Sequence, residues 1–329
     1  MTEATTETMT ALLATSPVRL APMAAFTNAA FRAVAVECGS GFTTHEEIDV
    51  DALLNGNASI EQATGIEAGR VVAMQLLGCT AETLVPAALE LVEAGADIID
   101  VNMGCPAPKV VRKGKGAALM RDVASTARVL SVLRAALDGV PLTIKIRGGW
   151  SDQESNAVEV ARMAQDVGVD AITVHPRTRA QRYGGKAPWD VIADVVQAVD
   201  IPVTGNGDVT SMVEARRMIA ETGCASVMIG RGALGRPWVF DESYEDLDEA
   251  GRADYEARVV TRHLELIEDL FAPREALLQA KKHLARYAAG RPGASTFRGE
   301  LFRQTSIEGT RDVFARAVEA TRPRGLLVR

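Results

Sequence analysis

The sequence predicts a (β/α)₈ barrel, an α/β fold of the TIM-barrel type, followed by a small all-helical domain. Two observations support this prediction. Strand-like and helix-like segments alternate eight times along the chain, and strand patterns then end near residue 244. A doubly wound sheet is the alternative fold. It usually has fewer strands and a glycine-rich turn after the first strand, whereas the first strand here leads into Pro22-Met23-Ala24.

The eight predicted strands are short apolar runs bounded by turn residues. In chain order they span residues 18–21, 41–44, 71–76, 98–101, 142–146, 171–174, 201–204 and 226–229. The stretches between them show the periodicity of amphipathic helices. In residues 81–94, for example, Leu84, Ala88 and Leu91 fall on one face. After residue 244 only helical patterns follow, predicted for residues 252–270, 274–288 and 297–304.

These patterns divide the chain into three parts. We expect a flexible tail at residues 1–17, a barrel at residues 18–243 and a helical domain at residues 244–329. The tail is threonine-rich and lacks the basic start and apolar centre of a signal peptide, which favours a cytoplasmic protein. We expect the whole protein to act as a monomer.

Composition excludes several classes of protein. No apolar run of the 329 residues is long enough to cross a bilayer, so no membrane association is expected. The four cysteines show no CxxC spacing, which argues against a metal site or a disulfide framework. The net charge is −7, yet residues 271–329 carry 12 Lys and Arg against 5 Asp and Glu. This asymmetry indicates either a basic appendage for a polyanion or a solvated helical face.

Polar residues follow nearly every predicted strand, at the end of a barrel where active sites lie. The most informative run is Asp100–Pro106, which places Cys105 on a tight turn after the fourth strand. A basic, glycine-punctuated loop follows at residues 109–116. A thiol beside clustered cations indicates a polyanionic substrate attacked or protonated at this turn.

The turns after the last two strands predict a phosphate site. They span residues 205–208 and 230–233, and their glycines allow close backbone approach while Arg231 adds charge. Lys145 lies within the fifth strand, where it could face a cofactor ring, form a Schiff base, or pair with a barrel carboxylate such as Asp100. His175 ends the sixth strand in a basic turn, which favours contact with a ligand.

The chain resembles the tRNA-dihydrouridine synthases, especially their bacterial branch. The signature of that branch is carried by Asp100–Lys109, with the sequence DVNMGCPAPK. Supporting matches lie in family order, and a C-terminal segment resembles the family's helical-domain motif. They are residues 20–23, 75–76, 116–120, 144–147, 175–179, 205–208, 228–240 and 281–287.

The resemblance implies an FMN-containing barrel that reduces uridine in tRNA with electrons from NADPH. Cys105 would donate a proton to C5 of the uracil while the flavin delivers hydride to C6. Asn102 would orient the uracil. Flavin contacts are implied for Pro22, Met23, Ala24, Gln75, Lys145, His175, Asn206, Gly207, Asp208, Gly230 and Arg231. RNA contacts are expected for Lys109, Arg112, Lys113, Lys115, Arg177, Arg179, Lys281, Lys282 and Arg286.

Three positions depart from the family pattern. Ala25 and Pro176 stand where glycine is common, and Arg286 stands where an aromatic residue often precedes the tyrosine. Two other functions stay open at this point: an FMN barrel that reduces a free pyrimidine, and a non-catalytic RNA-binding relative. The basic C-terminal region argues against the first, and the intact Cys105 and Lys145 argue against the second.

Overall fold

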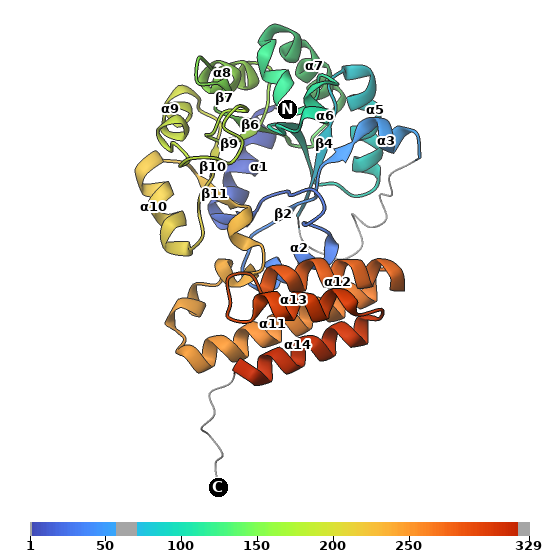
Figure 1. Ribbon diagram of the computed structural model, residues 1–329. Helices are drawn as coiled ribbons and strands as arrows, with labels where there is room; N and C mark the ends of the chain where they lie inside the picture. Colours follow the sequence, from blue (N-terminus) through green and yellow to red (C-terminus); the bar gives the residue numbers. More distant parts are fainter. Residues whose placement is uncertain (1, 57–70, 322–329) are drawn as a thin grey trace.

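A parallel barrel forms the upper part of the molecule in the computed structural model, which describes residues 2–56 and 71–321 (Figure 1). Its strands are β1 (Val18–Leu20), β2 (Thr43–Thr44), β3 (Ile48–Asp49), β4 (Val72–Leu77), β5 (Ile98–Met103), β6 (Leu142–Arg147), β9 (Ala171–His175), β10 (Val203–Asn206) and β11 (Ser226–Ile229). They pair in the order β1-β11-β10-β9-β6-β5-β4-β2, with β3 also on β4. β1 lies beside β2, so the barrel is nearly closed and the predicted fold class is confirmed.

Two features of the strands differ from the prediction. The second strand is split, because β2 and β3 pair with successive parts of β4 and leave residues 45–47 between them. A small antiparallel hairpin, β7 (Gly149–Ser151) and β8 (Glu154–Ser155), follows β6 outside the barrel. Both features place additional side chains at the carboxyl ends of the strands.

Helices surround the barrel (Figure 1). They are α2 (Ala29–Glu37), α3 (Val50–Leu54), α5 (Ala81–Glu93), α6 (Pro108–Val111), α7 (Val123–Ala136), α8 (Ala157–Asp166), α9 (Asp190–Ala198) and α10 (Met212–Thr222). Short 3₁₀ helices lie at η1 (Gly116–Arg121), η2 (Arg231–Ala233), η3 (Pro237–Phe240) and η4 (Glu242–Asp246). No helix of the described residues is long and apolar enough to span a membrane.

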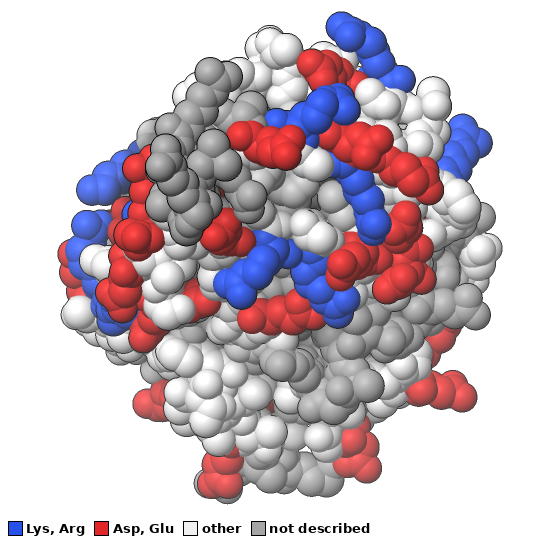
Figure 2. All heavy atoms as spheres, turned by 90° about the horizontal axis from the view of Figure 1, so that it is seen from below, with Lys and Arg blue, Asp and Glu red and all other residues white. Residues whose placement is uncertain are grey.

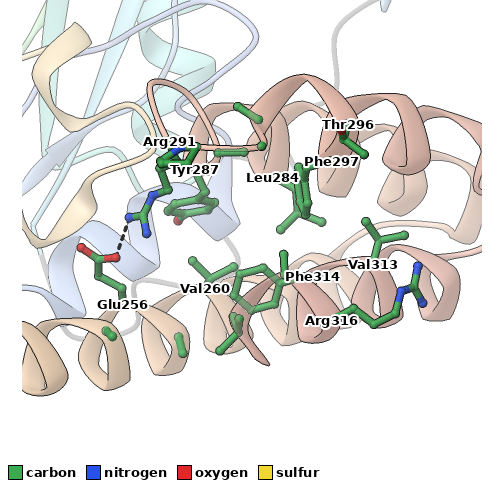
Figure 3. Close-up of a pocket in the computed structure, with 18 of the residues that line it drawn as sticks. Glu256, Val260, Leu284, Tyr287, Arg291, Thr296, Phe297, Val313, Phe314 and Arg316 are labelled. Atoms are coloured by element: carbon green, nitrogen blue, oxygen red, sulfur yellow. Dashed lines mark hydrogen bonds and ion pairs between the residues drawn. The ribbon is translucent and has the colours of Figure 1, made fainter. Parts of the chain in front are cut away.

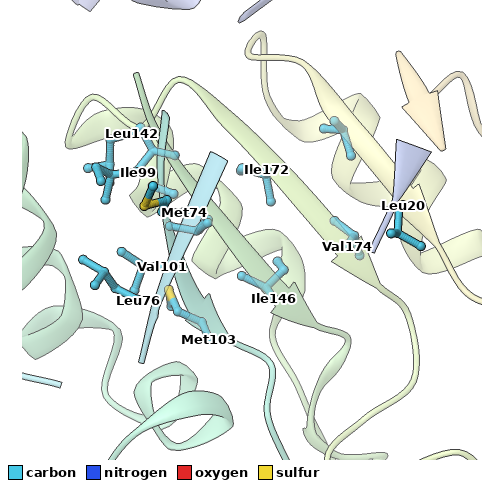
Figure 4. Packing of buried hydrophobic residues seen from close by; sticks show 14 of the residues in the cluster. Leu20, Met74, Leu76, Ile99, Val101, Met103, Leu142, Ile146, Ile172 and Val174 are labelled. Carbon is cyan, nitrogen blue, oxygen red and sulfur yellow. The ribbon is translucent and has the colours of Figure 1, made fainter. Parts of the chain in front are cut away.

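Apolar and polar residues alternate along several barrel strands, most regularly in β6 and from Ile99 onward in β5. The apolar members pack in one cluster with the surrounding helices (Figure 4). In β5 these are Ile99, Val101 and Met103, whereas Asp100 and Asn102 are polar and buried. Because side chains alternate across a strand, the polar set faces the barrel interior. Hydrogen bonds from Arg19 to Thr44, Thr173 and Thr204, on three other strands, place that side chain inside as well.

The flexible tail predicted for residues 1–17 is wrong. Residues Thr2–Thr15 form helix α1, in which Met9 and Leu13 are four residues apart and therefore share a face. Both are fully buried in a cluster with Phe42, Ala73, Ile98 and Ala171, at the amino-terminal ends of the strands. Thr5 and Thr6 donate hydrogen bonds to Asp170 at 2.6 and 2.9 Å. The helix thus closes the end of the barrel opposite the predicted active site.

The C-terminal helices form a bundle below the barrel (Figure 1). They are α11 (Glu249–Leu270), α12 (Pro273–Tyr287), α13 (Ala294–Arg303) and α14 (Ile307–Thr321), of which the sequence patterns had not indicated the last. Residues 322–329 of the predicted domain lie outside the described part. The bundle contacts the barrel through α11 and α2. At this joint Phe31 stacks on His283 at a centroid distance of 5.1 Å, and His263 contacts both rings.

Replacing Leu13 by alanine tests whether α1 is part of the folded core. The substitution removes a fully buried side chain, so we expect a loss of about 2–5 kcal/mol in the free energy of unfolding. The measurement is the midpoint of urea unfolding, monitored by circular dichroism. Glu7→Ala on the exposed side of the same helix is the control. Equal midpoints for the two variants would contradict the packing of α1 on the barrel.

The buried histidines at the joint predict acid sensitivity. Burial lowers the pKa of His263 to about 3, from an ordinary value of 6.5. Between these values the unfolded chain binds a proton that the folded chain does not. The free energy of unfolding therefore falls as pH drops from about 6.5 towards 3, by about 1.4 kcal/mol per pH unit for each such histidine. In His263→Phe this slope should decrease by about 1.4 kcal/mol per pH unit, the contribution of one proton. It is measured by urea unfolding from pH 7 to 4. A slope equal to that of the wild type would contradict the prediction.

Candidate active site

The Cys105 turn is held by the amide of Asn102, at the end of β5. Asn102 Oδ1 accepts hydrogen bonds from the backbone N–H groups of Gly104 at 3.0 Å and Cys105 at 2.9 Å. Its Nδ2 donates to Gln75 Oε1 and to Glu47 Oε2, both at 2.8 Å. These four bonds use both hydrogens of the amide and both lone pairs of its oxygen. Asn102 therefore positions the cysteine turn, and contact with a uracil would require one of these bonds to break.

Glu47 is a site residue to which the sequence assigned no role. It lies between β2 and β3, and its Oε1 accepts a hydrogen bond from the thiol of Cys105 at 3.9 Å. Burial, with the nearby Glu47 carboxylate as the next cause, raises the pKa of Cys105. The thiol is therefore held in its protonated form, as a proton donor requires. The available signal was the polar run His45-Glu46-Glu47 at a strand end.

The buried carboxylate of Asp100 holds Gln75, one of the two acceptors for the Asn102 amide. Asp100 accepts hydrogen bonds from Gln75 Nε2 and Thr143 Oγ1, each at 2.6 Å. Burial raises the pKa of Asp100, while these two hydrogen bonds and the positive charges of Arg19 and Lys145 oppose that rise. Because Gln75 donates to Asp100 and accepts from Asn102, its amide has one defined orientation with one hydrogen left to donate.

Lys145 and His175 meet at the side chain of Asn206. Lys145 Nζ donates to Asn206 Oδ1 at 3.2 Å, and His175 Nδ1 lies 2.9 Å from the same oxygen. Asn206 Nδ2 donates to the Met228 carbonyl, so its oxygen is the acceptor for both neighbours. His175 is therefore protonated on Nδ1, and its buried Nε2 has no partner within the described structure. Burial lowers the pKa of Lys145 to about 8 and that of His175 to about 3.

The phosphate turns predicted after β10 and β11 lie against each other. A Cβ added at Gly232 would come within 2.3 Å of the Val209 carbonyl oxygen, so only glycine fits there. Gly230 lies close to Ala21 and Met23 of the first strand end. The structure thus brings Met23 of the predicted flavin-lining segment beside Gly230. The unpartnered His175 Nε2 and the close approach of these backbone turns are compatible with a bound flavin.

Asp208 holds two arginines. Its carboxylate accepts two hydrogen bonds from the buried Arg177, at 2.9 and 2.6 Å, and one from Arg231 at 3.3 Å. Arg177 is only 1% exposed, so the structure does not support the predicted RNA contact for this residue. Its guanidinium instead ties the β9 turn to the β10 turn through Asp208. Arg231 is half-exposed and is free to face an anion on its other side.

Lys115 also departs from the predicted RNA-binding set. It is 3% exposed and forms ion pairs with Asp49 at 2.9 Å and Asp51 at 2.8 Å, at the start of α3. Two of its donors are thereby bound within the protein, and phosphate has no access to a side chain buried this deeply. The pairs tie the loop that carries Cys105 to the end of β3. Three other basic residues of this loop are exposed: Lys109, Arg112 and Lys113.

Arg179 lies on the β7–β8 hairpin side of the site. Its guanidinium stacks on Trp150 at 4.6 Å, and Arg121 stacks on the same indole, also at 4.6 Å. An indole between two cations is stabilised by their attraction to its π-system. These two arginines lie at the same end of the barrel as Cys105. The hairpin brings them together through Trp150, and the sequence patterns had not indicated this hairpin.

The helical domain contacts the strand-one loop through α12. Lys282 Nζ donates a hydrogen bond to the carbonyl of Ala25, and Glu46 accepts one from the Ala25 N–H. Ala25 has φ = 65°, a left-handed conformation that an alanine adopts only under constraint, and these two contacts supply it. Arg286 stacks on Phe26 at 5.0 Å. Lys282 is therefore a link between the domains, while Arg286 stays exposed.

The lower face of the helical domain carries mixed charge. Figure 2 shows basic and acidic side chains interspersed there, without one continuous basic patch among the residues it describes. Three of the arginines of α12–α14 and their connections pair with glutamates: Arg291 with Glu256, Arg311 with Glu268 and Arg316 with Glu300. These three positive charges are thus compensated, whereas Lys282 and Arg286 lie on the side of α12 that contacts the loop after β1.

A cavity of about 500 Å³ lies inside the helical bundle (Figure 3). Leu284 and Tyr287 of α12 line it together with Phe297 and Phe314, and the Arg291–Glu256 ion pair lies at one end. None of the residues that line it belongs to the Cys105 turn or to the phosphate turns. This cavity is therefore distinct from the candidate active site at the end of the barrel.

Comparisons with known proteins agree on one family. The dihydrouridine synthase (Dus) family model matches residues 19–321. The chain is 39% identical over 288 residues to tRNA-dihydrouridine synthase B of Pseudomonas putida, covering 86% of this chain and 85% of that protein. It is 37% identical over 316 residues to tRNA-dihydrouridine synthase B of Xanthomonas campestris, covering 93% of this chain and 95% of that protein.

Solved structures show the same barrel at low sequence identity. Histamine dehydrogenase from Rhizobium has a TM-score of 0.55 and 13% identity, over 76% of this chain and 49% of that one. The 6-hydroxypseudooxynicotine amine oxidase from Pseudomonas geniculata has a TM-score of 0.57 and 16% identity, over 75% and 50%. The chain spans about half the length of these two structures. Identities this low support the fold alone.

Proposed function

The chain belongs to the dihydrouridine synthase family, and on this premise we propose that it reduces uridines in tRNA to 5,6-dihydrouridine. The observation that carries the proposal is the thiol of Cys105, held against Glu47, at the same barrel end as Lys145, His175 and the phosphate turns. We infer FMN as the bound cofactor and NADPH as the electron donor. The substrate is a folded RNA, so we place the enzyme in the cytoplasm, where it would act as a monomer.

The polar groups around Asn206 suit the flavin. Lys145 can donate a hydrogen bond to the polar edge of the ring system. Its positive charge would stabilise the negative charge that develops there on reduction. The lone pair of His175 Nε2 suits a hydroxyl or N–H donor of the cofactor, since Nδ1 carries the proton. Gln75 has one free amide hydrogen for the same edge. When bound, the reduced flavin supplies the hydride that adds to C6 of uracil.

Cys105 supplies the proton. Hydride addition at C6 leaves negative charge at C5, and a neutral thiol on the opposite side of the base can neutralise it. The Asn102 bonds to the Gly104 and Cys105 N–H groups fix the turn that aims Sγ. Arg147 Nε donates to the Gly104 carbonyl at 2.7 Å and fixes the turn from the other side.

The target base has to leave its stack to reach this depth, and the surrounding cations would hold the backbone. The basic loop at residues 109–116, which follows the Cys105 turn, carries the exposed Lys109, Arg112 and Lys113. Across the site, Arg286 and Lys281 lie on α12. We propose that these two groups contact phosphates on either side of the reduced nucleotide, with Arg179 on the hairpin side.

Flavin binding is tested with two variants and two ligands. Lys145→Met should weaken both FMN and riboflavin about tenfold or more, because a charge-assisted hydrogen bond to the ring is lost. Arg231→Ala should weaken FMN similarly and leave riboflavin unchanged, since riboflavin has no phosphate. Affinities are read from the quenching of flavin fluorescence by the apoprotein. A wild type that binds neither ligand would refute the flavin assignment.

Cys105→Ala is expected to lose most tRNA reduction, by about 10²–10⁴-fold, because the general acid is missing. Oxidation of NADPH by the flavin should continue at the wild-type rate, since no protonation of uracil occurs in that half-reaction. Dihydrouridine is measured by mass spectrometry of digested tRNA, with free uracil as a second substrate and Cys79→Ala as the control. Wild-type rates in Cys105→Ala would place the acid elsewhere, and preference for free uracil would indicate a pyrimidine reductase.

The RNA contacts predict a salt dependence. Combining Lys281→Ala with Arg286→Ala should weaken tRNA binding and reduce the slope of log K against log salt by about one to two units. The matched control combines Arg311→Ala with Arg316→Ala, which removes two cations already paired with glutamates. Binding is measured by filter retention from 50 to 300 mM salt. Equal effects in the two double variants would mean that α12 does not contact phosphate.

A further inference from the structure

Glu47 is placed where the active-site cysteine exchanges its proton. Its two carboxyl oxygens have different partners: Oε1 faces the thiol of Cys105 at 3.9 Å, and Oε2 accepts from Asn102 at 2.8 Å. The bond to Asn102 fixes the carboxyl group, so that Oε1 is directed at sulfur. The split of the second strand creates this position, because Glu47 immediately precedes β3.

The position of Glu47 is braced from both neighbouring loops. Asp49, two residues further on, receives Lys115 at 2.9 Å, and Lys115 closes the loop that begins at Cys105. A Cβ added at Gly116 would come within 2.7 Å of the Cys105 carbonyl oxygen, so the two ends of that loop touch. The loop carrying the acid and the segment carrying Glu47 are thus joined at Asn102 and at Lys115.

The charged groups around the pair define its electrostatics. Burial raises the pKa of Glu47, and Asp49 and Glu46 add to that rise. The hydrogen bond from Cys105 and the charge of Lys109 of α6 oppose it. Arg147 of β6 faces Cys105 and favours the thiolate, which burial and Glu47 oppose. A carboxylate beside a thiol is the stable pair at rest, because two anions at this distance repel each other and a carboxyl group is ordinarily the stronger acid of the two.

Resting on the proposed function, we propose that Glu47 is a positioning residue that keeps Cys105 protonated and returns a proton to it after each reduction. The S–H bond of Cys105 breaks as its proton passes to C5 of uracil, leaving a thiolate beside the Glu47 carboxylate. The paired negative charges favour uptake of a proton by Glu47 from a hydronium ion or a buffer acid in the solvent, which leaves water or the buffer base. That proton then moves from Oε1 to sulfur, which restores the thiol and the carboxylate.

The first test is the titration of the thiol without tRNA. In Glu47→Gln the acidic neighbour is replaced by a neutral group of the same size. The pH midpoint for alkylation of Cys105 by iodoacetamide should fall by about one unit, equivalent to about tenfold more thiolate at a fixed pH below the midpoint. Peptide mass spectrometry reads Cys79 in the same sample as an internal control, and its midpoint should not move.

The matched control variant is Glu46→Gln, which removes the same charge from the adjacent residue. Glu46 bonds to Ala25 and not to the thiol, so its removal should leave the Cys105 midpoint in place. Glu47→Asp keeps the charge but withdraws it from sulfur, and it provides a second reading if Glu47→Gln folds poorly. A Cys105 midpoint equal to that of the wild type in both Glu47 variants would overturn the proposal, whether or not the protein reduces tRNA.

The second test separates proton return from positioning. A resting thiol already carries its proton, so the first turnover of prereduced Glu47→Gln with tRNA should stay within a few fold of the wild type. Steady-state reduction should fall about tenfold or more, with the NADPH half-reaction measured alone as a control. If the first turnover and the steady state slow equally, Glu47 does not return the proton. A wild type inactive on tRNA would instead refute the proposed function, while the thiol titration still reports the contact.

Discussion

The buried carboxylate of Asp100 is the interaction on which the site depends. It lies inside the barrel, where an ionised group is costly unless hydrogen bonds and opposite charge compensate for burial. Thr143 and Gln75 donate to it, and Arg19 and Lys145 provide the charge. Since Gln75 is bound to Asp100, its other end can only accept, and Asn102 is oriented in turn. The hydrogen bonds that order the Cys105 turn through Asn102 thus start at Asp100, two residues before Asn102 in β5.

The alternation of the strands makes this chain of bonds possible. Asp100, Asn102, Thr143 and Lys145 lie in register on β5 and β6, with Asp100 opposite Thr143 and Asn102 opposite Lys145. Their apolar neighbours pack against the helices outside. A barrel with a polar interior needs many satisfied hydrogen bonds, and Arg19 makes three of them with threonines on other strands. The same interior that costs stability therefore holds the reactive groups rigidly at its upper end.

The helical domain contributes to this end of the barrel as well as lying beside it. Lys282 of α12 donates to the carbonyl of Ala25, and Glu46, between β2 and β3, accepts from its N–H. Ala25 keeps its left-handed conformation although it is not glycine, because these contacts hold the loop. The loop after β1, which is expected to line the flavin, is therefore shaped jointly by both domains.

Much of the fold and part of the site could be predicted from the sequence alone. Local periodicity determines strands and helices, so eight strands and the change to helices near residue 244 were visible in the pattern. Polar residues after each strand also had to gather at one end, because parallel strands of a barrel share their carboxyl ends. That rule places Cys105, Lys145, His175 and Asn206 together from the sequence alone.

What the tertiary structure decided is which partner each polar group takes. Lys115 and Arg177 look like phosphate ligands in the sequence, yet Asp49, Asp51 and Asp208 bind them inside the protein. Met9 and Leu13 belong to a weakly patterned segment, and only the open end of the barrel gives them a place to be buried. Glu47 meets Cys105 across a separation of 58 residues. Composition and spacing determine the kind of group that a chain presents, whereas charge pairing and burial depend on distances that only the folded chain sets.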